Sequence, residues 1–173
     1  MNTIPRRVIK RLSPETTSLF VCDIQEIFRP LIYNSETVIA RRLTMLSLIH
    51  VPCSHRVKLI PTFMYFSVLF IPRRSNFMYK LSKLLSIPCF TTEHYPKVFG
   101  HTVPDLAIDS PIYEKRMFSM LTEEVQGAFK QSGRQSAILV GIEAHACILQ
   151  TAMDLIEDDK DVFVICDAVS SQK

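Results

Sequence analysis

SAILVGIEAHACILQTAMDLIE, residues 136–157, joins two patterns that decide the fold. Its first part, 136–141, is a short, nearly continuous apolar run that ends in glycine. Such a run is typical of a parallel strand covered on both faces. Its second part, from about Ala146 to Glu157, is predicted to be a helix. A strand followed by a helix after a short turn is the repeating unit of α/β folds.

The same alternation extends outward along the chain. Further strands are predicted at 18–23, 87–91 and 161–166, where short apolar runs recur. Helices are predicted at 35–49, with Ser35 as N-cap, and at 121–132, with Thr122 as N-cap and Gly133 just past the end. Because strands alternate with helices, the sequence predicts an α/β fold with a mostly parallel sheet.

Composition limits the classes of protein to consider. The chain has 173 residues, of which 47% are hydrophobic and 21% charged, as expected of one folded globular domain spanning 1–173. A net charge of +3, with no basic cluster interleaved with aromatic residues, does not indicate a nucleic-acid partner. Five cysteines without a C-x-x-C pair favour reduced thiols over disulfides or structural zinc.

The N-terminal residues 1–12 are interpreted as a solvated tail. They lack the apolar segment of a secretory signal, so a cytoplasmic location is expected. The alternative is an organellar location such as the mitochondrion, because four basic residues there faintly resemble a transit peptide: Arg6, Arg7, Lys10 and Arg11.

The segment 44–92 contains no aspartate or glutamate and breaks the pattern. Within it, IPTFMYFSVLFIP (60–72) is shorter than the roughly 20 apolar residues that a membrane span needs. We therefore expect no membrane partner, although an interfacial or re-entrant role stays open. An additional buried strand or an aberrant insert fits this stretch better.

Several side chains that could carry chemistry follow predicted strands. Ligands of open α/β sheets bind beyond the carboxyl ends of the strands, where Asp23, Thr92, Cys147 and Asp167 lie. The start of a helix favours the thiolate form of a cysteine such as Cys147. Position alone fits an inert buried thiol at least as well. Taken alone, Asp23 fits a helix cap or loop carboxylate better than a general base, and Lys115 fits a solvated surface lysine.

Three motifs favour one of these alternatives: VCDIQEIFRP (21–30), EKRMFSM (114–120) and LVGIEAHACILQTAMDL (139–155). In this order they resemble the isochorismatase-like hydrolases, a superfamily of cysteine hydrolases that includes the nicotinamidases. TTEHYPKVFGHTVPDL (91–106) and ICDAVSSQ (165–172) resemble the animal isochorismatase domain-containing subgroup. The resemblance covers roughly 13–46 and 81–173. It implies a three-layer αβα fold and hydrolysis of a small amide- or imide-type substrate through a covalent intermediate.

The resemblance also implies roles for individual residues. Asp23, Lys115 and Cys147 match the catalytic triad, with Cys147 as nucleophile and Asp23 as the base that Lys115 holds. A cis peptide bond is implied at Ile142–Glu143, aiming the Glu143 and Cys147 N–H groups at an oxyanion. The matching substrate-binding positions are Gln25, Phe28, His94, Tyr95 and Phe118.

No cofactor or metal is implied, because the Asp/His metal-site spacing of the nicotinamidase branch has no counterpart here. His50, Cys53 and His55 lie close in sequence without a companion carboxylate, which also disfavours a metal site. The implied partner is a small-molecule substrate, with no nucleic acid and no membrane. Family members often self-associate, so a homo-oligomer is compatible with the resemblance.

Two features depart from the family pattern. An insert at about 47–80 separates two pieces that would otherwise form one helix, and we expect it to loop out of the fold. The sequence also stops at Lys173, where the family continues with a helix, a strand and a further helix, which would leave a sheet edge exposed. These departures motivate the alternative hypothesis of an inactive, truncated variant that acts as a binding or interaction protein.

Overall fold

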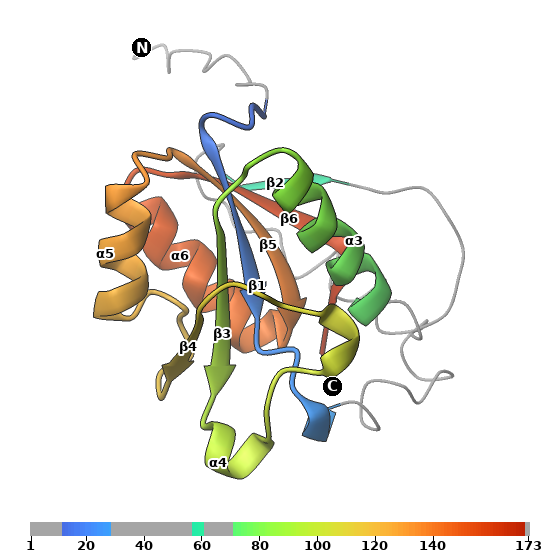
Figure 1. The fold of residues 1–173 in the computed structure, drawn as a ribbon. Helices are drawn as coiled ribbons and strands as arrows, with labels where there is room; N and C mark the ends of the chain where they lie inside the picture. Colours follow the sequence, from blue (N-terminus) through green and yellow to red (C-terminus); the bar gives the residue numbers. More distant parts are fainter. Residues whose placement is uncertain (1–11, 29–56, 61–70, 172–173) are drawn as a thin grey trace, which may run out of the picture.

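Six parallel strands form one sheet in the order β2-β6-β5-β1-β3-β4. The computed structural model describes residues 12–28, 57–60 and 71–171 (Figure 1). The strands are β1 (Thr17–Cys22), β2 (Val57–Ile60), β3 (Cys89–His94), β4 (Ile112–Lys115), β5 (Ser136–Ile142) and β6 (Asp161–Ser170). The predicted parallel α/β sheet is therefore confirmed.

The central strand β1 is buried on both faces, as its continuous apolar run predicts. Phe20 and Cys22 point into one core cluster, and Leu19 and Val21 point into the other. Helices α5 (Glu123–Gln131) and α6 (Leu149–Glu157) cover the first face, and α3 (Ile71–Leu84) covers the second (Figure 1). The chain thus forms the three-layer αβα arrangement.

Most predicted element boundaries hold within a few residues. Helix α5 begins where Thr122 was predicted to cap it, and the Thr122 Oγ1 accepts a hydrogen bond from the Val125 N–H at 3.3 Å. Gly133 lies beyond the end of α5 with φ 67°, a left-handed conformation that glycine adopts without strain. The short strand β4 was not predicted, because only four residues form it and Ile112 and Glu114 are exposed. The predicted helix at 35–49 lies outside the described residues.

The expectation that 47–80 loops out is wrong for the parts that the structure describes. Residues 57–60 form β2, which pairs in parallel with the first half of β6, from Val57 opposite Val162 to Ile60 opposite Ile165. That half of β6 is therefore no exposed edge. Residues 71–80 begin α3, whose Tyr79 is 3% exposed in the core. Tyr79 packs in the apolar cluster that also holds Leu19 and Val21, and such burial is favourable even in a segment without a clear strand or helix period.

The connections after the strands gather at one end of the sheet, because all the strands run in the same direction. Three short helical segments lie there: η1 (Glu26–Phe28), α4 (Pro96–Phe99) and η3 (Pro104–Leu106). In Figure 1 the arrowheads of β1, β3 and β4 point toward α4. Within 12–28, 57–60 and 71–171, no helix combines the length and apolar character that crossing a membrane would take.

Candidate active site

Lys115 lies at the centre of the candidate site, at the end of β4, and only 2% of it is exposed. Its Nζ is 2.7 Å from Asp23 Oδ2 and 3.4 Å from Cys147 Sγ. Asp23 follows β1, and Cys147 lies in the turn that leads from β5 into α6. The fold thus brings together the three residues of the predicted triad from three separate parts of the sequence.

The Lys115 ammonium is surrounded by more acceptors than it has protons. It also donates to the carbonyl oxygens of Met117 (3.0 Å) and Phe118 (2.9 Å), and it lies 3.3 Å from His94 Nδ1. Burial alone would lower the pKa of Lys115, but the charge of Asp23 and its hydrogen bond to the ammonium outweigh burial and raise that pKa. Lys115 is therefore a fixed cation rather than a proton acceptor.

Asp23 is held from two sides. Its Oδ1 accepts a hydrogen bond from Thr92 Oγ1 at 2.8 Å, and its backbone N–H donates to the Thr92 carbonyl at 3.2 Å. Its φ of 48° places it in the left-handed region, which is uncommon for a residue with a side chain. Such strain persists only where the surroundings enforce it. Thr92, noted at a strand end but given no role by the sequence, is the positioning partner of the carboxylate.

Cys147 is 4% exposed and belongs to a π-helical turn, η4 (Ala144–Ile148), which precedes α6. The Ile148 N–H donates to the Glu143 carbonyl at 3.3 Å, the five-residue spacing of this helix type. Thr151 Oγ1 donates to the Cys147 carbonyl at 2.6 Å and accepts from the Met120 N–H at 2.9 Å. Thr151 therefore ties the Cys147 turn to the loop that carries the Lys115 contacts.

The predicted cis peptide is not found. No described peptide bond is cis, so the Ile142–Glu143 bond is trans. The chain reverses instead at Glu143, whose φ of 57° and ψ of 56° are left-handed. A left-handed residue can turn a strand into a following helix, so the turn does not require a cis bond. Glu143 Oε2 lies near Ser171 Oγ (3.4 Å) and His145 Nδ1 (3.5 Å).

Gly141, the residue before Ile142, lets the ends of β1 and β5 approach closely. Its φ is 137°, and a Cβ there would lie 2.2 Å from the Cys22 carbonyl oxygen and 2.7 Å from the Cys22 Cβ. Only glycine fits this position without displacing backbone. Local patterns predict no role for Gly141 beyond ending an apolar run, because its partner Cys22 is more than a hundred residues away.

Two of the predicted substrate-binding residues have structural partners. Gln25 is 1% exposed, and its Nε2 donates to the carbonyls of His94 (3.1 Å) and Gly100 (2.6 Å) while its Oε1 accepts from the His94 N–H (2.8 Å). Phe28 is 8% exposed and packs on Phe99 with ring centroids 5.3 Å apart. These side chains support the loop after β3.

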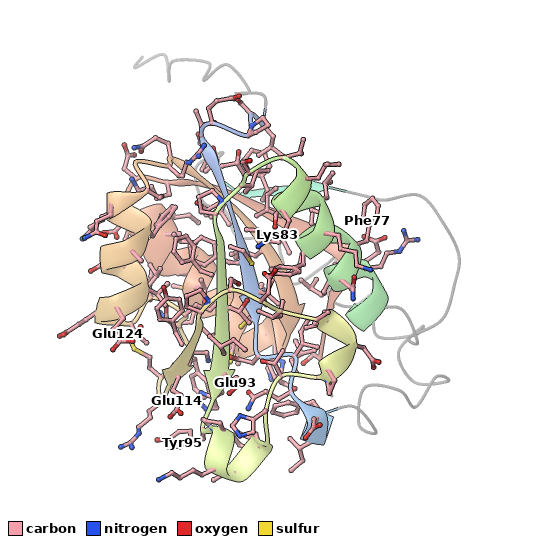
Figure 2. All side chains as sticks on the ribbon, viewed as in Figure 1. Phe77, Lys83, Glu93, Tyr95, Glu114 and Glu124 are labelled. Atoms are coloured by element: carbon pink, nitrogen blue, oxygen red, sulfur yellow. The ribbon has the colours of Figure 1, made fainter. Side chains whose placement is uncertain are left out.

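The other three form an aromatic rim, defined here as His94, Tyr95 and Phe118. The His94 ring lies 6.1 Å from Phe118 in a stacked arrangement and 4.9 Å edge-on from Tyr95, centroid to centroid. Tyr95 is 40% and Phe118 60% exposed, and Figure 2 labels Tyr95 at the outer end of β3.

His94 also contacts the buried cation. Burial lowers the pKa of His94, and the charge of Lys115 lowers it further. Its Nδ1 faces the Lys115 ammonium at 3.3 Å and so acts as the acceptor. A neutral imidazole that accepts at Nδ1 carries its proton on Nε2. His94 therefore offers an N–H donor on the side of the ring away from Lys115.

Glu93, labelled in Figure 2, fastens the neighbouring loop and was not singled out by the sequence. Its Oε1 accepts from the Thr102 N–H at 2.6 Å and its Oε2 lies 3.0 Å from His101 Nδ1. Burial tends to raise the pKa of Glu93, but its bonds to Thr102 and His101 prevail and lower it. The bond to Glu93 raises the pKa of His101. The two charges thus stabilise each other beside Gln25.

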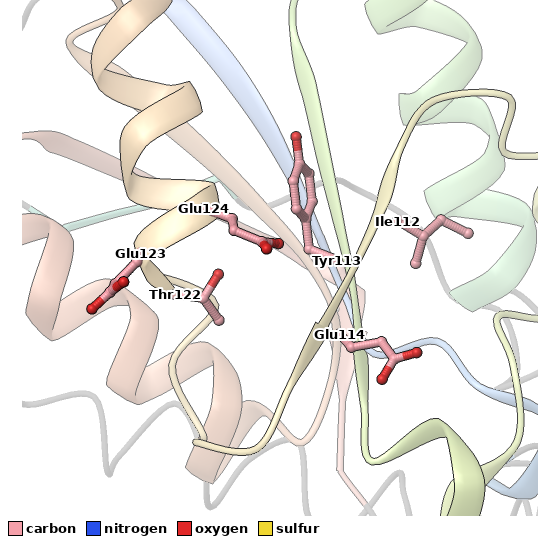
Figure 3. Close-up of a pocket in the computed structure, with 6 residues that line it drawn as sticks. All are labelled: Ile112, Tyr113, Glu114, Thr122, Glu123 and Glu124. Atoms are coloured by element: carbon pink, nitrogen blue, oxygen red, sulfur yellow. The ribbon is translucent and has the colours of Figure 1, made fainter.

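A surface pocket of about 520 Å³ lies elsewhere, between β4 and the start of α5 (Figure 3). Its lining residues are Ile112, Tyr113, Glu114, Thr122, Glu123 and Glu124. None of them belongs to the predicted site. The pocket is open and acidic, and Lys115, the next residue of β4, is buried among Asp23 and Cys147 instead.

Three possible metal donors also meet at the site. The ligand atoms of Cys22, Asp23 and Cys147 lie within 4.8 Å of one another. Lys115 Nζ already contacts two of these residues, so its charge takes the place that a cation would need. His50, Cys53 and His55, which the sequence disfavoured as ligands, lie outside the described residues.

Comparisons with known proteins agree with this fold. The Isochorismatase domain model matches residues 17–173. The chain is 33% identical over 171 residues to Isochorismatase family protein 1A of Dictyostelium discoideum, covering 94% of this chain and 67% of that protein. It is 36% identical over 166 residues to Isochorismatase domain-containing protein 2 of Danio rerio, covering 95% and 68%.

A solved structure is similar over the same extent. The structure described as MAR1 ribonuclease from Caenorhabditis elegans is 34% identical, with a TM-score of 0.71, and the match covers 95% of this chain and 69% of that one. With a parallel αβα sheet and a family match over nearly its whole length, the chain belongs to the isochorismatase domain family and has the fold of isochorismatase-like hydrolases.

Proposed function

We propose that this chain is a cysteine hydrolase that cleaves a small amide- or imide-type substrate through a covalent intermediate on Cys147. One observation carries the proposal: a buried Lys115 ammonium lies between the Asp23 carboxylate (2.7 Å) and the Cys147 thiol (3.4 Å). A purely structural lysine would need one counter-charge. A lysine that faces a carboxylate and a thiol together stabilises the anionic form of both.

In the first half of the reaction, Asp23 accepts the Cys147 proton. A carboxylate oxygen of Asp23 lies within 4.8 Å of Sγ, a separation that a small side-chain movement closes. The sulfur attacks the substrate carbonyl carbon, and the carbonyl oxygen takes up the negative charge. The N–H group of Cys147, in the turn that leads into α6, is the proposed donor to this oxygen, and removal of one such donor typically costs about 10²–10³ in rate.

In the second half, Asp23 returns the proton to the departing nitrogen, and the C–N bond breaks to leave a thioester on Cys147. Asp23 then takes a proton from water, which attacks the thioester and releases the carboxylic acid and the thiol. Lys115 keeps its proton throughout, because its pKa is raised. Its charge holds the carboxylate in reach of both the sulfur and the water.

The aromatic rim bears on the size of the substrate. Cys147 is 4% exposed, whereas Tyr95 and Phe118 of the rim are 40% and 60% exposed. A small substrate can reach a recessed thiol past such a rim, and the His94 Nε2–H can donate to one of its polar atoms. The name of the solved neighbour raises RNA as a competing substrate. The recessed nucleophile favours a small molecule over a polymer.

Thiol reactivity tests the proposal. Burial raises the pKa of Cys89 to about 12 and, together with the Cys147 contact, raises that of Cys22 well above its ordinary value. Iodoacetamide near neutral pH should therefore label Cys147 in preference to these thiols. Labelling should fall sharply in K115M and D23N, whereas C89S should label Cys147 like the parent protein.

Turnover distinguishes the remaining alternatives. A panel of small amides and imides, with single-stranded RNA as a separate arm, should give hydrolysis that depends on Cys147 only for the small molecules. Unselective labelling without turnover would favour the alternative of an inactive binding or interaction protein. If the protein releases RNA fragments and C147S abolishes that release, RNA would replace small amides and imides as the proposed substrate.

A further inference from the structure

Cys22 is a second buried thiol at the site, and the proposed reaction does not use it. Its Sγ, the Cys147 Sγ and a carboxylate oxygen of Asp23 all lie within 4.8 Å of one another. Both cysteines belong to the same core cluster, on the face of the sheet that α5 and α6 cover, and both are free. The end of β1 therefore places a reserve thiol next to the proposed nucleophile.

We propose that Cys22 is a resolving thiol, so that oxidation of Cys147 by a peroxide ends in a reversible Cys22–Cys147 disulfide. This inference rests on the proposed function, since it needs Cys147 to be the reactive thiol. The disulfide stops hydrolysis while it lasts and protects the nucleophile from further oxidation.

The distance can be closed by a local movement. A disulfide needs sulfurs about 2.05 Å apart, compared with the separation of at most 4.8 Å in the reduced protein. The Cys22 backbone is fixed by pairing with β5 and by the tight contact to Gly141. Cys147 lies instead outside the sheet, in the single π-helical turn η4, a rare helix type that is frequent at functional sites. The movement that closes the distance between the two sulfurs is therefore a movement of Cys147.

Formation of the Cys22–Cys147 disulfide consumes a peroxide and no other added reactant. The Cys147 thiolate attacks the peroxide, the O–O bond breaks, and Cys147 becomes a sulfenic acid. The departing oxygen takes the proton that Cys147 had given to Asp23 and leaves as water or an alcohol. The Cys22 sulfur then attacks the Cys147 sulfur, the S–O bond breaks and water departs with the Cys22 proton. Cys22 Sγ donates to Asp23 Oδ2 at 3.3 Å, so Asp23 is placed to accept that proton and pass it on.

The surroundings of Cys22 keep this thiol from reacting with the peroxide itself. Burial raises the pKa of Cys22, and both its hydrogen bond with Cys147 and the charge of Asp23 raise it further. A thiol that stays protonated is a poor target for peroxide. Once Cys147 is a sulfenic acid, the neutral Cys22 lies next to the electrophilic sulfur. The two thiols thus have separate roles despite their proximity.

Mass spectrometry of the full chain tests the proposal. The reduced protein is exposed to hydrogen peroxide, its remaining thiols are blocked with N-ethylmaleimide, and it is digested without reductant. We expect a peptide pair joining Cys22 to Cys147, two hydrogens lighter than the separate peptides, that a reductant releases with recovery of Cys147 labelling. In C22S the pair is lost, and Cys147 proceeds to sulfinic acid that a reductant does not reverse.

Matched variants and a second readout complete the test. C89S and C53S should keep the linked pair, and C22A repeats the experiment in case C22S folds poorly. The inference is overturned if Cys147 reaches sulfinic acid equally fast with and without Cys22, or if it links to another cysteine. If iodoacetamide labels Cys147 selectively but no link forms, the hydrolase proposal stands alone. If Cys147 is neither labelled nor oxidised, both proposals fail.

Discussion

The buried centre and the aromatic rim of the candidate site differ in how firmly they are held. In the centre, Asp23, Lys115 and Cys147 are each at most 4% exposed, and each has several polar partners. In the rim, Tyr95 and Phe118 are 40% and 60% exposed, and among the described residues their rings contact the His94 ring. The centre is held by buried polar contacts, whereas Tyr95 and Phe118 of the rim can be replaced with little effect on the fold.

Substitution of Lys115 by methionine should have the largest effect on stability, because it removes the buried cation that contacts both Asp23 and Cys147. Removing one partner of a buried ion pair leaves an uncompensated charge, here on Asp23, and typically costs about 3–5 kcal/mol. Urea unfolding of K115M should show this loss, and Cys147 labelling should fall with it.

Lys83 provides the matched control for Lys115. It also pairs with an aspartate, Asp109, at 2.9 Å, but the two side chains are 53% and 65% exposed. An exposed pair contributes little to stability, so K83M should unfold almost like the parent protein. Equal losses for K83M and K115M would contradict the account of a buried, fixed centre.

Substitution of Gly141 by alanine should come next, because it pushes the backbone that carries Cys22 and Asp23. The added Cβ would lie 2.2 Å from the Cys22 carbonyl oxygen at a φ that disfavours alanine. Overpacking of this kind typically costs about 1–3 kcal/mol. Thermal and urea unfolding give the loss, and the labelling rate of Cys147 reports the displaced centre.

Gly127 is the control for Gly141, since a Cβ there meets nothing within 4 Å in the middle of α5. G127A should stabilise the protein by about 0.5–1 kcal/mol, because glycine is a poor helix former. The same substitution should thus act with opposite signs at the two glycines. A neutral G141A would mean that β1 and β5 can separate at this point without harm to the site.

Lys115 and Gly141 also differ in whether the sequence could predict their roles. The apolar run that became β1 and the helix start at Cys147 are local patterns, and the motifs linked Asp23, Lys115 and Cys147 by resemblance. The role of Gly141 depends on the register between β1 and β5, which no local pattern carries. The nearness of Cys22 and Cys147 depends on the same pairing. The error at Ile142–Glu143 arose because a left-handed residue makes the turn that the family pattern assigns to a cis bond.

The contact between the Glu93 carboxylate and the His101 ring, called the clasp below, should make a smaller, pH-dependent contribution to stability. The pKa of Glu93 is lowered, so its contribution is present above its ordinary value of 4.5 and is lost as the pH falls through the lowered value. The pKa of His101 is raised, so its contribution is complete below 6.5 and is lost as the pH rises through the raised value. Stability from the clasp is therefore greatest between these limits.

Thermal unfolding across this pH range tests the clasp. In E93Q the part of the profile that belongs to the clasp should flatten on both sides, because residue 93 no longer titrates and His101 loses its charged partner. In H101Q only the loss toward higher pH should disappear, since Glu93 still accepts from the Thr102 N–H. A profile of E93Q that parallels the parent protein at every pH would show that the clasp contributes nothing.

Substitution of Phe118 by alanine should have the smallest effect on stability. It tests the comparison at the rim instead of at the buried centre. The side chain is 60% exposed, and surface changes usually stay within about 0.5 kcal/mol. The Lys115 contact survives, because it uses the Phe118 carbonyl and not the ring. Labelling of Cys147 by the small reagent iodoacetamide should therefore be unchanged, while KM for a hydrolysed amide should rise with kcat nearly constant. A fall in kcat and in labelling together would place Phe118 with the centre and would remove the distinction between fixed chemistry and an adaptable rim.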